Sequence, residues 1–166
     1  MGSVIRFDRR NGPAEDRISR SMVGRAHAVW RGTARAGTGA IAVAAAPASE
    51  RFYSFAPSVA SGGGTNPGEL LAAAHASSFL MNLAAGLQAA GYTPSELSAE
   101  AVVTLEPDGP GVRIGRSALR LRAKVPGLAR RAFEALAGYA QRTCPVSKAL
   151  NAQITLDARL TGECQA

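Results

Sequence analysis

The chain has 166 residues, 46% of them hydrophobic, so its length and composition favour a globular protein with a substantial core. Its formal net charge of +7 comes almost wholly from arginine, much of it within residues 1–31. No basic segment is interleaved with aromatic residues, which disfavours nucleic-acid binding. The two cysteines, Cys144 and Cys164, are too few for a disulfide scaffold, and we expect free thiols in a reducing compartment.

The N-terminal region is rich in arginine and lacks the apolar segment of a signal peptide. The longest apolar stretch, residues 70–87, is interrupted by polar residues and falls short of a membrane span. We therefore expect a cytoplasmic protein with no membrane contact. Residues 1–24 mix charges with Gly and Pro without a steady period, which predicts an Arg-rich extension that is disordered or contacts a partner.

From residue 25 onward the pattern changes to that of one folded domain, residues 25–166. Short β-like runs at residues 26–30, 40–44 and 51–55 are separated by turns that contain Gly or Pro. Runs of this length with short connections are typical of neighbouring strands. They predict an antiparallel meander at the start of the domain.

A long helix is predicted next, because Asn66 can cap it, Pro67 suits its first position and Glu69 can complete a capping box. We expect it to run to about Ala90, with Gly91 as its stop. At about 1.5 Å per residue this is a rod of about 37 Å. The helix is apolar nearly all round, so it requires burial on every side, and a dimer partner could supply part of that cover.

Two strand-like runs follow, residues 97–105 and 112–125, joined by a turn over residues 106–111. In the second run, arginines alternate with apolar residues, which predicts one face toward water. Pro126 and Gly127 mark the start of a further helix, which is expected over residues 128–141. Its apolar face comprises Phe133, Leu136, Ala137 and Ala140.

The chain then reaches Cys144 and Pro145, after which a short helix is expected over residues 146–150. A last strand, residues 152–160, alternates apolar and polar positions. The order β-β-β-α-β-β-α-α-β predicts an α+β fold in which a curved antiparallel sheet packs on the long helix.

Three segments carry a family resemblance: residues 64–76 (GTNPGELLAAAHA), residues 91–94 (GYTP) and residues 144–150 (CPVSKAL). Together with Tyr53 and Phe55 upstream, they occur in the order found in the OsmC/Ohr family, the osmotically induced and organic hydroperoxide resistance proteins, which they resemble. The resemblance implies the OsmC-like fold. It also implies an intertwined homodimer in which two long helices cross under the sheets, with two active sites at the interface.

In that family a cysteine of the long helix attacks the peroxide O–O bond as a thiolate, and a second cysteine resolves the sulfenic acid as a disulfide. An Arg and a Glu activate the first cysteine. The family has this cysteine directly before a Phe, so Ser78, which precedes Phe79, occupies its position. Gly68 stands where the family has the Glu, and Ser58 where it has the Arg. Because the cysteine and both of its activating groups are missing together, we interpret Ser78 as natural divergence rather than an engineered substitution.

The catalytic candidates are therefore Cys144, retained in the second cysteine's position at a predicted helix N-terminus, and Ser78. Cys144 is either a lone redox thiol or a relic of the resolving role; Ser78 either lines an apolar pocket or bonds to its own helix. Glu69, His75 and Phe79 are the candidate binding residues. The spacing of His75 to Ser78 suits neighbouring helix positions, but no carboxylate orients a Ser-His pair, which favours a structural role for His75.

The resemblance implies descent from hydroperoxide defence. If the chain is an enzyme, it is a peroxidase-type oxidoreductase that acts on organic hydroperoxides through Cys144 and an external thiol reductant, with weak or no activity. The alternative is a non-redox protein that binds or transforms a hydrophobic small molecule in the dimer-interface pocket. No His, Cys and Asp cluster suggests a metal, and we expect no cofactor.

Overall fold

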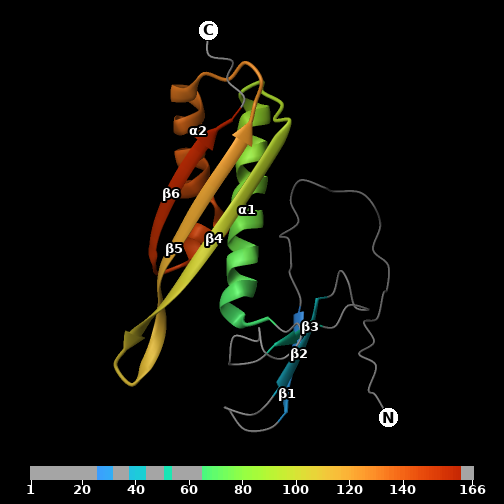
Figure 1. Ribbon diagram of the computed structural model, residues 1–166, viewed down its shortest axis with the longest axis vertical. Coiled ribbons are helices and arrows are strands. Elements are labelled where there is room, and N and C mark those ends of the chain that lie inside the picture. The colour runs from blue at the N-terminus through green and yellow to red at the C-terminus, as the bar shows by residue number, and fades with distance from the viewer. Residues whose placement is uncertain (1–25, 32–37, 44–50, 54–64, 162–166) are drawn as a thin grey trace, which may run out of the picture. The chain divides into compact units, whose positions relative to one another are not determined.

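The computed structural model of the chain describes residues 26–31, 38–43, 51–53 and 65–161 (Figure 1). The expected N-terminal extension, Ser58 and Cys164 lie outside the described residues. The chain divides into two compact units at residue 66.

The first unit contains an antiparallel sheet of strands β1 (Ala26–Arg31), β2 (Thr38–Val43) and β3 (Arg51–Tyr53), in the order β1-β2-β3. Ala28 pairs with Ile41, which on its other side pairs with Arg51. The predicted antiparallel meander is confirmed.

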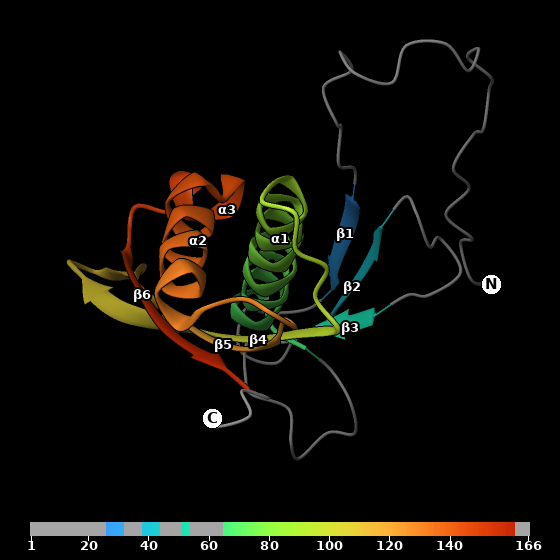
Figure 2. The same ribbon diagram turned by 90° about the horizontal axis from the view of Figure 1, so that it is seen from above.

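The second unit is a three-stranded sheet with all its helices on one face (Figure 2). Its elements are α1 (Pro67–Ala89), β4 (Glu96–Asp108), β5 (Gly111–Lys124), α2 (Arg130–Thr143), α3 (Pro145–Ala149) and β6 (Gln153–Leu160). The α+β class predicted from the sequence is confirmed.

The sheet of this unit is mixed rather than wholly antiparallel as we expected. Strand β5 pairs with β4 antiparallel through a hairpin, but it pairs with β6 parallel, with Leu119 beside Leu156. A parallel pair needs a crossover of a dozen or more residues, and α2 with α3 provides it. The two helices carry the chain back along the sheet face, so β6 starts from the same end as β5.

Helix α1 begins at Pro67 as predicted and ends one residue earlier than expected. Gly91, at φ 83°, forms its stop: the Tyr92 N–H donates to the Leu87 carbonyl at 2.9 Å and the Gly91 N–H to the Gln88 carbonyl at 3.0 Å. These paired bonds define a Schellman motif, in which glycine is preferred because a side chain strains a positive φ.

Within residues 65–161 only one stripe of α1 is buried, so this unit alone does not meet the expectation of burial on every side. The buried residues recur every four positions: His75, Phe79, Leu83 and Leu87. This stripe packs against β4, α2 and α3. By length and composition alone α1 is long and apolar enough to cross a membrane, contrary to our expectation, but Phe79, Leu83 and Leu87 belong to the hydrophobic core of this unit.

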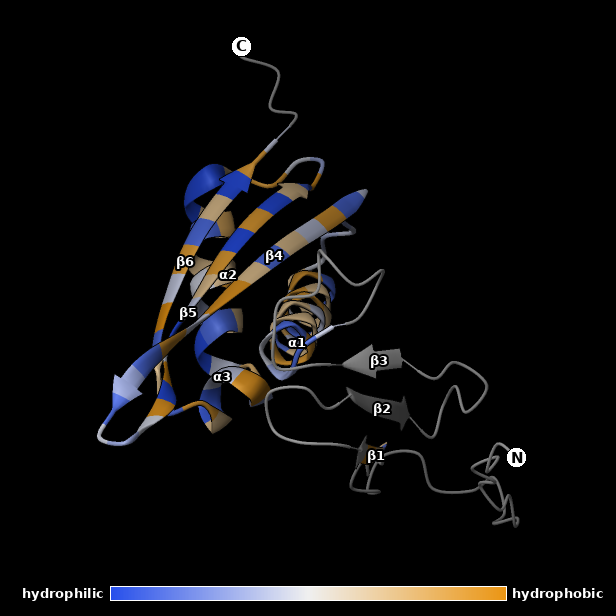
Figure 3. Ribbon diagram, turned by 60° about the horizontal axis from the view of Figure 1, so that its bottom comes forward, coloured by the Kyte–Doolittle hydropathy of each residue, from blue (hydrophilic) through white to orange (hydrophobic). Residues whose placement is uncertain are grey.

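The core lies between the sheet and the helices. Along β4, β5 and β6, hydrophobic and hydrophilic bands alternate, as Figure 3 shows, because successive side chains point to opposite faces. The inward positions include Leu119, Leu121 and Ala123 of β5, which pack with Phe79 and Phe133.

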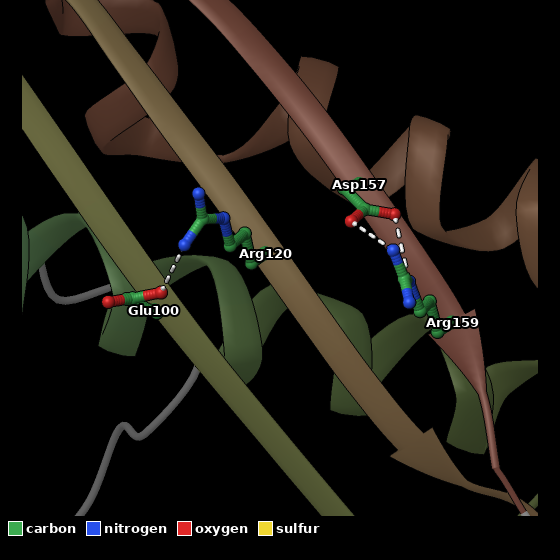
Figure 4. Close-up of polar contacts among 4 residues, drawn as sticks. All are labelled: Glu100, Arg120, Asp157 and Arg159. Atoms are coloured by element: carbon green, nitrogen blue, oxygen red, sulfur yellow. Dashed lines mark hydrogen bonds and ion pairs between the residues drawn. The ribbon is translucent and has the colours of Figure 1, made fainter.

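The outer face of the same sheet is charged. Glu100 accepts a hydrogen bond from Arg120 at 3.2 Å across β4 and β5, and Arg159 contacts Asp157 within β6 at 3.3 Å (Figure 4). These pairs are largely exposed, so each contributes little to stability. The alternating arginines of β5 are exposed on this side and form the predicted wet face.

Most element boundaries differ from the prediction by one to three residues, and two of the differences have a clear cause. The β4–β5 hairpin turns at Gly109 and Pro110 instead of over residues 106–111, since the strands run on to Asp108 and from Gly111. Helix α2 starts at Arg130 instead of residue 128, because Ala129 has an extended backbone, with φ −67° and ψ 142°, and forms the N-cap. The predicted apolar face of α2 is confirmed by the burial of Phe133, Ala137 and Ala140 and the partial burial of Leu136.

Candidate functional site

The two catalytic candidates meet side by side. The Cys144 thiol donates a hydrogen bond to Ser78 Oγ, with 3.4 Å between sulfur and oxygen. Cys144 is fully buried, while Ser78, on α1, is partly exposed. Any reagent that approaches the sulfur from this side therefore passes Ser78.

Cys144 is held by the ends of two helices. Its backbone N–H donates to the Ala140 carbonyl at 2.9 Å, which closes α2, and its carbonyl accepts from the Lys148 N–H at 3.0 Å, which opens α3. Pro145 at the first position of α3 favours the extended backbone seen at Cys144, with ψ 126°. The sequence thus places the thiol at a junction that has little conformational freedom.

A side chain of α1 fixes this junction from the other direction. Asn82 Nδ2 donates to the Ala140 carbonyl and to Thr143 Oγ1, both at 2.8 Å. Asn82 lies one turn after Ser78, so the last turn of α2 is fastened to α1 beside the thiol. Asn82 is a site residue that the sequence did not reveal, because its partner is a backbone carbonyl of a distant helix.

The polar groups around Cys144 favour its thiolate. Burial raises the pKa of the Cys144 thiol, but this effect is outweighed by the hydrogen bonds that Ser78, Ser147 and the backbone N–H groups at the start of α3 offer to the thiolate form. The pKa of the thiol therefore lies below its ordinary value. A lower pKa increases the thiolate fraction at neutral pH, and the thiolate is the nucleophilic form.

His75 lies next in this cluster. It is fully buried, its Nδ1 is 2.8 Å from Ser117 Oγ of β5, and its Nε2 is 2.8 Å from Ser147 Oγ of α3. Burial lowers the pKa of His75, so the neutral imidazole is favoured. Neither Ser117 nor Ser147 was a predicted site residue. The available signal for Ser117 was its hydroxyl on the inward, otherwise apolar face of β5.

The remaining predicted binding residues lie elsewhere. Phe79 is fully buried in the core of the unit. Glu69 is exposed in the first turn of α1, nine residues before Ser78, which is about 14 Å along the helix axis. The arrangement thus brings Ser78, His75 and Cys144 together and leaves Glu69 apart. Among the residues that the structure describes, no three His, Cys, Asp or Glu side chains gather as a metal site would require.

These features define a class of protein: an α+β protein with a buried thiol between two hydroxyls at a helix junction. The sequence profile of the family described as OsmC-like protein matches residues 60–159. The chain is also 36% identical over 137 residues to peroxiredoxin OsmC of Escherichia coli (strain K12), across 82% of this chain and 94% of the relative. The chain belongs to the OsmC-like protein family.

Solved structures agree with this assignment. The organic hydroperoxide resistance protein OhrB of Bacillus subtilis superposes with a TM-score of 0.62 at 27% identity, over 81% of this chain and 98% of that one. An OsmC-like protein from Mycoplasma pneumoniae gives a TM-score of 0.69 at 13% identity, over 86% of this chain and 100% of that one, which shows the shared fold. The family resemblance read from the sequence is confirmed.

Proposed function

We propose that this protein reduces organic hydroperoxides through Cys144 alone, and that it lacks the two-cysteine route of its relatives. Relatives named as a peroxiredoxin and as an organic hydroperoxide resistance protein support the substrate class. The observation that carries the proposal is the 3.4 Å contact between Cys144 Sγ and Ser78 Oγ. A hydroxyl occupies the place beside the thiol where a second sulfur would be needed to form a disulfide.

The chemistry follows from the thiolate at Cys144. Its sulfur attacks one oxygen of the hydroperoxide, an S–O bond forms, the O–O bond breaks, and the alkoxide leaves as an alcohol after taking a proton. Cys144 becomes a sulfenic acid. Because Ser78 cannot resolve it, an external dithiol reduces the sulfenic acid back to the thiol and releases water. The need for this reductant supports a cytoplasmic location.

The proposal also predicts slow turnover. Cys144 is fully buried, and its neighbour Ser78 is only partly exposed, so a peroxide has restricted access to the sulfur. The Glu and Arg expected from the family resemblance are replaced by Gly68 and Ser58, so no charged pair is expected to orient the peroxide. We also propose that the protein is a homodimer, because α1 exposes apolar surface that includes Met81 at 67% exposure.

The test is consumption of cumene hydroperoxide with a dithiol reductant, followed by stopped flow. We expect slow consumption by the unchanged protein, none by Cys144→Ser, and unchanged consumption by the control Cys164→Ser. Trapping with dimedone, followed by mass spectrometry, should find the sulfenic acid on Cys144.

Two outcomes contradict the proposal. Turnover as fast as that of a two-cysteine relative measured in parallel would show that Ser78 does not impair the route. No consumption, together with an unoxidised Cys144, would favour the alternative, a non-redox protein that binds a hydrophobic small molecule. A thermal-shift screen with lipophilic compounds then tests that alternative.

A further inference from the structure

The cluster around Cys144 continues as a chain of hydrogen bonds into the core. Ser117, His75 and Ser147 are joined by two contacts of the imidazole ring, both 2.8 Å, and Ser147 lies in the first turn of α3, directly after Cys144. Ser117 lies in β5 and His75 in α1. Ser147 lies in α3, and Cys144 lies at the junction of α2 and α3. Ser117, His75 and Cys144 are fully buried. In such a place the direction of each hydrogen bond matters, because an unsatisfied donor is costly.

The direction can be derived from the buried end of the chain. Within the described residues, the Ser117 hydroxyl contacts only His75 Nδ1. If Ser117 accepted a proton from Nδ1, its own O–H would be buried with no acceptor. Ser117 therefore donates to Nδ1, and a neutral imidazole with an accepting Nδ1 carries its proton on Nε2.

The same logic passes through Ser147. An Nε2–H donates to Ser147 Oγ, so the Ser147 hydroxyl cannot donate to the ring. Ser147 lies in the first turn of α3, directly after Cys144, and its remaining proton is available to the Cys144 sulfur. The opposite tautomer would use that proton on Nε2 and leave only lone pairs facing the sulfur. Lone pairs favour a protonated thiol, whereas a donated O–H favours a thiolate.

We propose that His75 is a positioning residue for the Cys144 thiolate: Ser117 fixes its Nε2–H tautomer, and His75 thereby orients the Ser147 hydroxyl to donate to the sulfur. The inference rests on the proposed thiol chemistry of Cys144 and adds a role for two residues that do not touch the sulfur.

Among the described residues, no buried charged side chain lies beside these four residues to change the protonation state of His75. The titratable groups on the elements packed around it are exposed, and they include Glu69 of α1, Glu100 of β4, Arg116 of β5, Arg142 of α2 and Lys148 of α3. Burial is the cause that lowers the pKa of His75. The neutral ring assumed above is therefore the form that the fold favours.

The first test reads the tautomer directly. The chain has two histidines, so the ring nitrogens of His75 are assigned by comparison with His27→Gln. We expect ¹⁵N chemical shifts with the proton on Nε2 in the unchanged protein. A proton on Nδ1 would overturn the proposal, and no variant that risks misfolding is involved in this result.

The second test is titration of the thiolate by its ultraviolet absorbance, in a Cys164→Ser background. Ser117→Ala should move the Cys144 midpoint upward by about one pH unit, which is tenfold less thiolate well below the midpoint. Ser117→Thr keeps the hydroxyl and should restore the midpoint. The control Ser77→Ala, whose hydroxyl bonds to its own helix at 2.8 Å, should leave the midpoint unchanged.

The midpoint is also the result that can refute the proposal. If a folded Ser117→Ala variant has the same Cys144 midpoint as the parent protein, Ser117 does not act on the sulfur. Neither measurement uses a peroxide. A correct tautomer and a shifted midpoint without hydroperoxide consumption would refute only the proposed function, whereas consumption with an Nδ1–H tautomer would refute only the role of His75.

Discussion

With serine instead of cysteine at position 78, the neighbouring Cys144 thiol can keep a lowered pKa but cannot form a disulfide with that position. Its hydroxyl can donate to the Cys144 thiolate and so helps to lower the pKa of that thiol. It cannot form a covalent bond to sulfur under redox conditions. The substitution therefore preserves the conditions for a nucleophilic thiol while it removes the internal resolving step.

A single change tests this separation. In Ser78→Cys the new sulfur lies where an oxygen is now 3.4 Å from Cys144 Sγ, so we expect a disulfide to form on addition of hydroperoxide. The bond would close a loop between positions 66 apart and raise the free energy of unfolding by up to about 4 kcal/mol. Urea unfolding of the oxidised and reduced variant measures the difference.

Ser77→Cys is the matched control, because Ser77 is exposed on the same helix and its hydroxyl bonds to the Ala73 carbonyl of that helix. It should form no internal disulfide and show no redox-dependent stability. An unbridged Ser78→Cys after oxidation would mean that the backbones cannot approach, and the assignment of Ser78 to the reactive position would be wrong.

The buried His75 predicts how stability depends on pH. Its folded pKa is lowered from 6.5 by burial, so just below pH 6.5 the unfolded chain binds a proton that the folded chain does not. Stability is then full above about pH 6.5 and falls as the pH decreases toward the folded pKa, by at most about 1.4 kcal/mol per pH unit.

Urea unfolding across this range, repeated for two variants, isolates the effect. His75→Gln should be less stable overall but lose this slope, and His27→Gln, at an exposed position, should keep it. A slope that persists in His75→Gln would assign the pH dependence to other groups.

Among the helices and strands, local sequence signals predicted the ends and faces of the elements, but they did not predict how the strands pair. Pro67 and Gly91 carry their own start and stop signals, and the alternation along β5 marks its two faces; these features need no tertiary information. The parallel β5–β6 pair depends on how α2 packs, which the sequence order does not state. The partners of His75 could not be predicted for the same reason, since Ser117 and Ser147 approach it from distant elements.

The stop of α1 offers a direct test of one such local signal. Gly91 has φ 83° and open space around it, so Gly91→Ala meets no clash and costs only backbone strain, about 1 kcal/mol. Gly91→Asn should cost less, because asparagine tolerates this conformation better. Thermal unfolding of both variants measures the order; equal stability of the Ala and Gly proteins would show that the stop does not limit α1.

For the whole molecule, the apolar side of α1 that residues 65–161 leave uncovered needs a partner surface. The helix has one buried stripe, and the residues on its other side include Ala74, Met81 and Ala85, which are exposed. An apolar helix face toward water is unfavourable in proportion to its area. A second copy of the chain would cover this surface and bring two Ser78–Cys144 sites into one assembly, which is why the proposed homodimer belongs with the proposed function.

Replacing Met81 with lysine tests the homodimer at this surface. Burial of one such side chain contributes about 1.5–3 kcal/mol, and a symmetric dimer buries two, so Met81→Lys should weaken dimerisation by about 100-fold or more. Light scattering coupled to size exclusion over a concentration series gives the dissociation constant. Tyr139→Lys, at a residue 57% exposed on α2, is the matched control and should leave the constant unchanged. A dimer that tolerates Met81→Lys but not Tyr139→Lys would place the interface on α2. A parent protein that is monomeric at all concentrations would contradict the proposed homodimer, and each site would then work within a single chain.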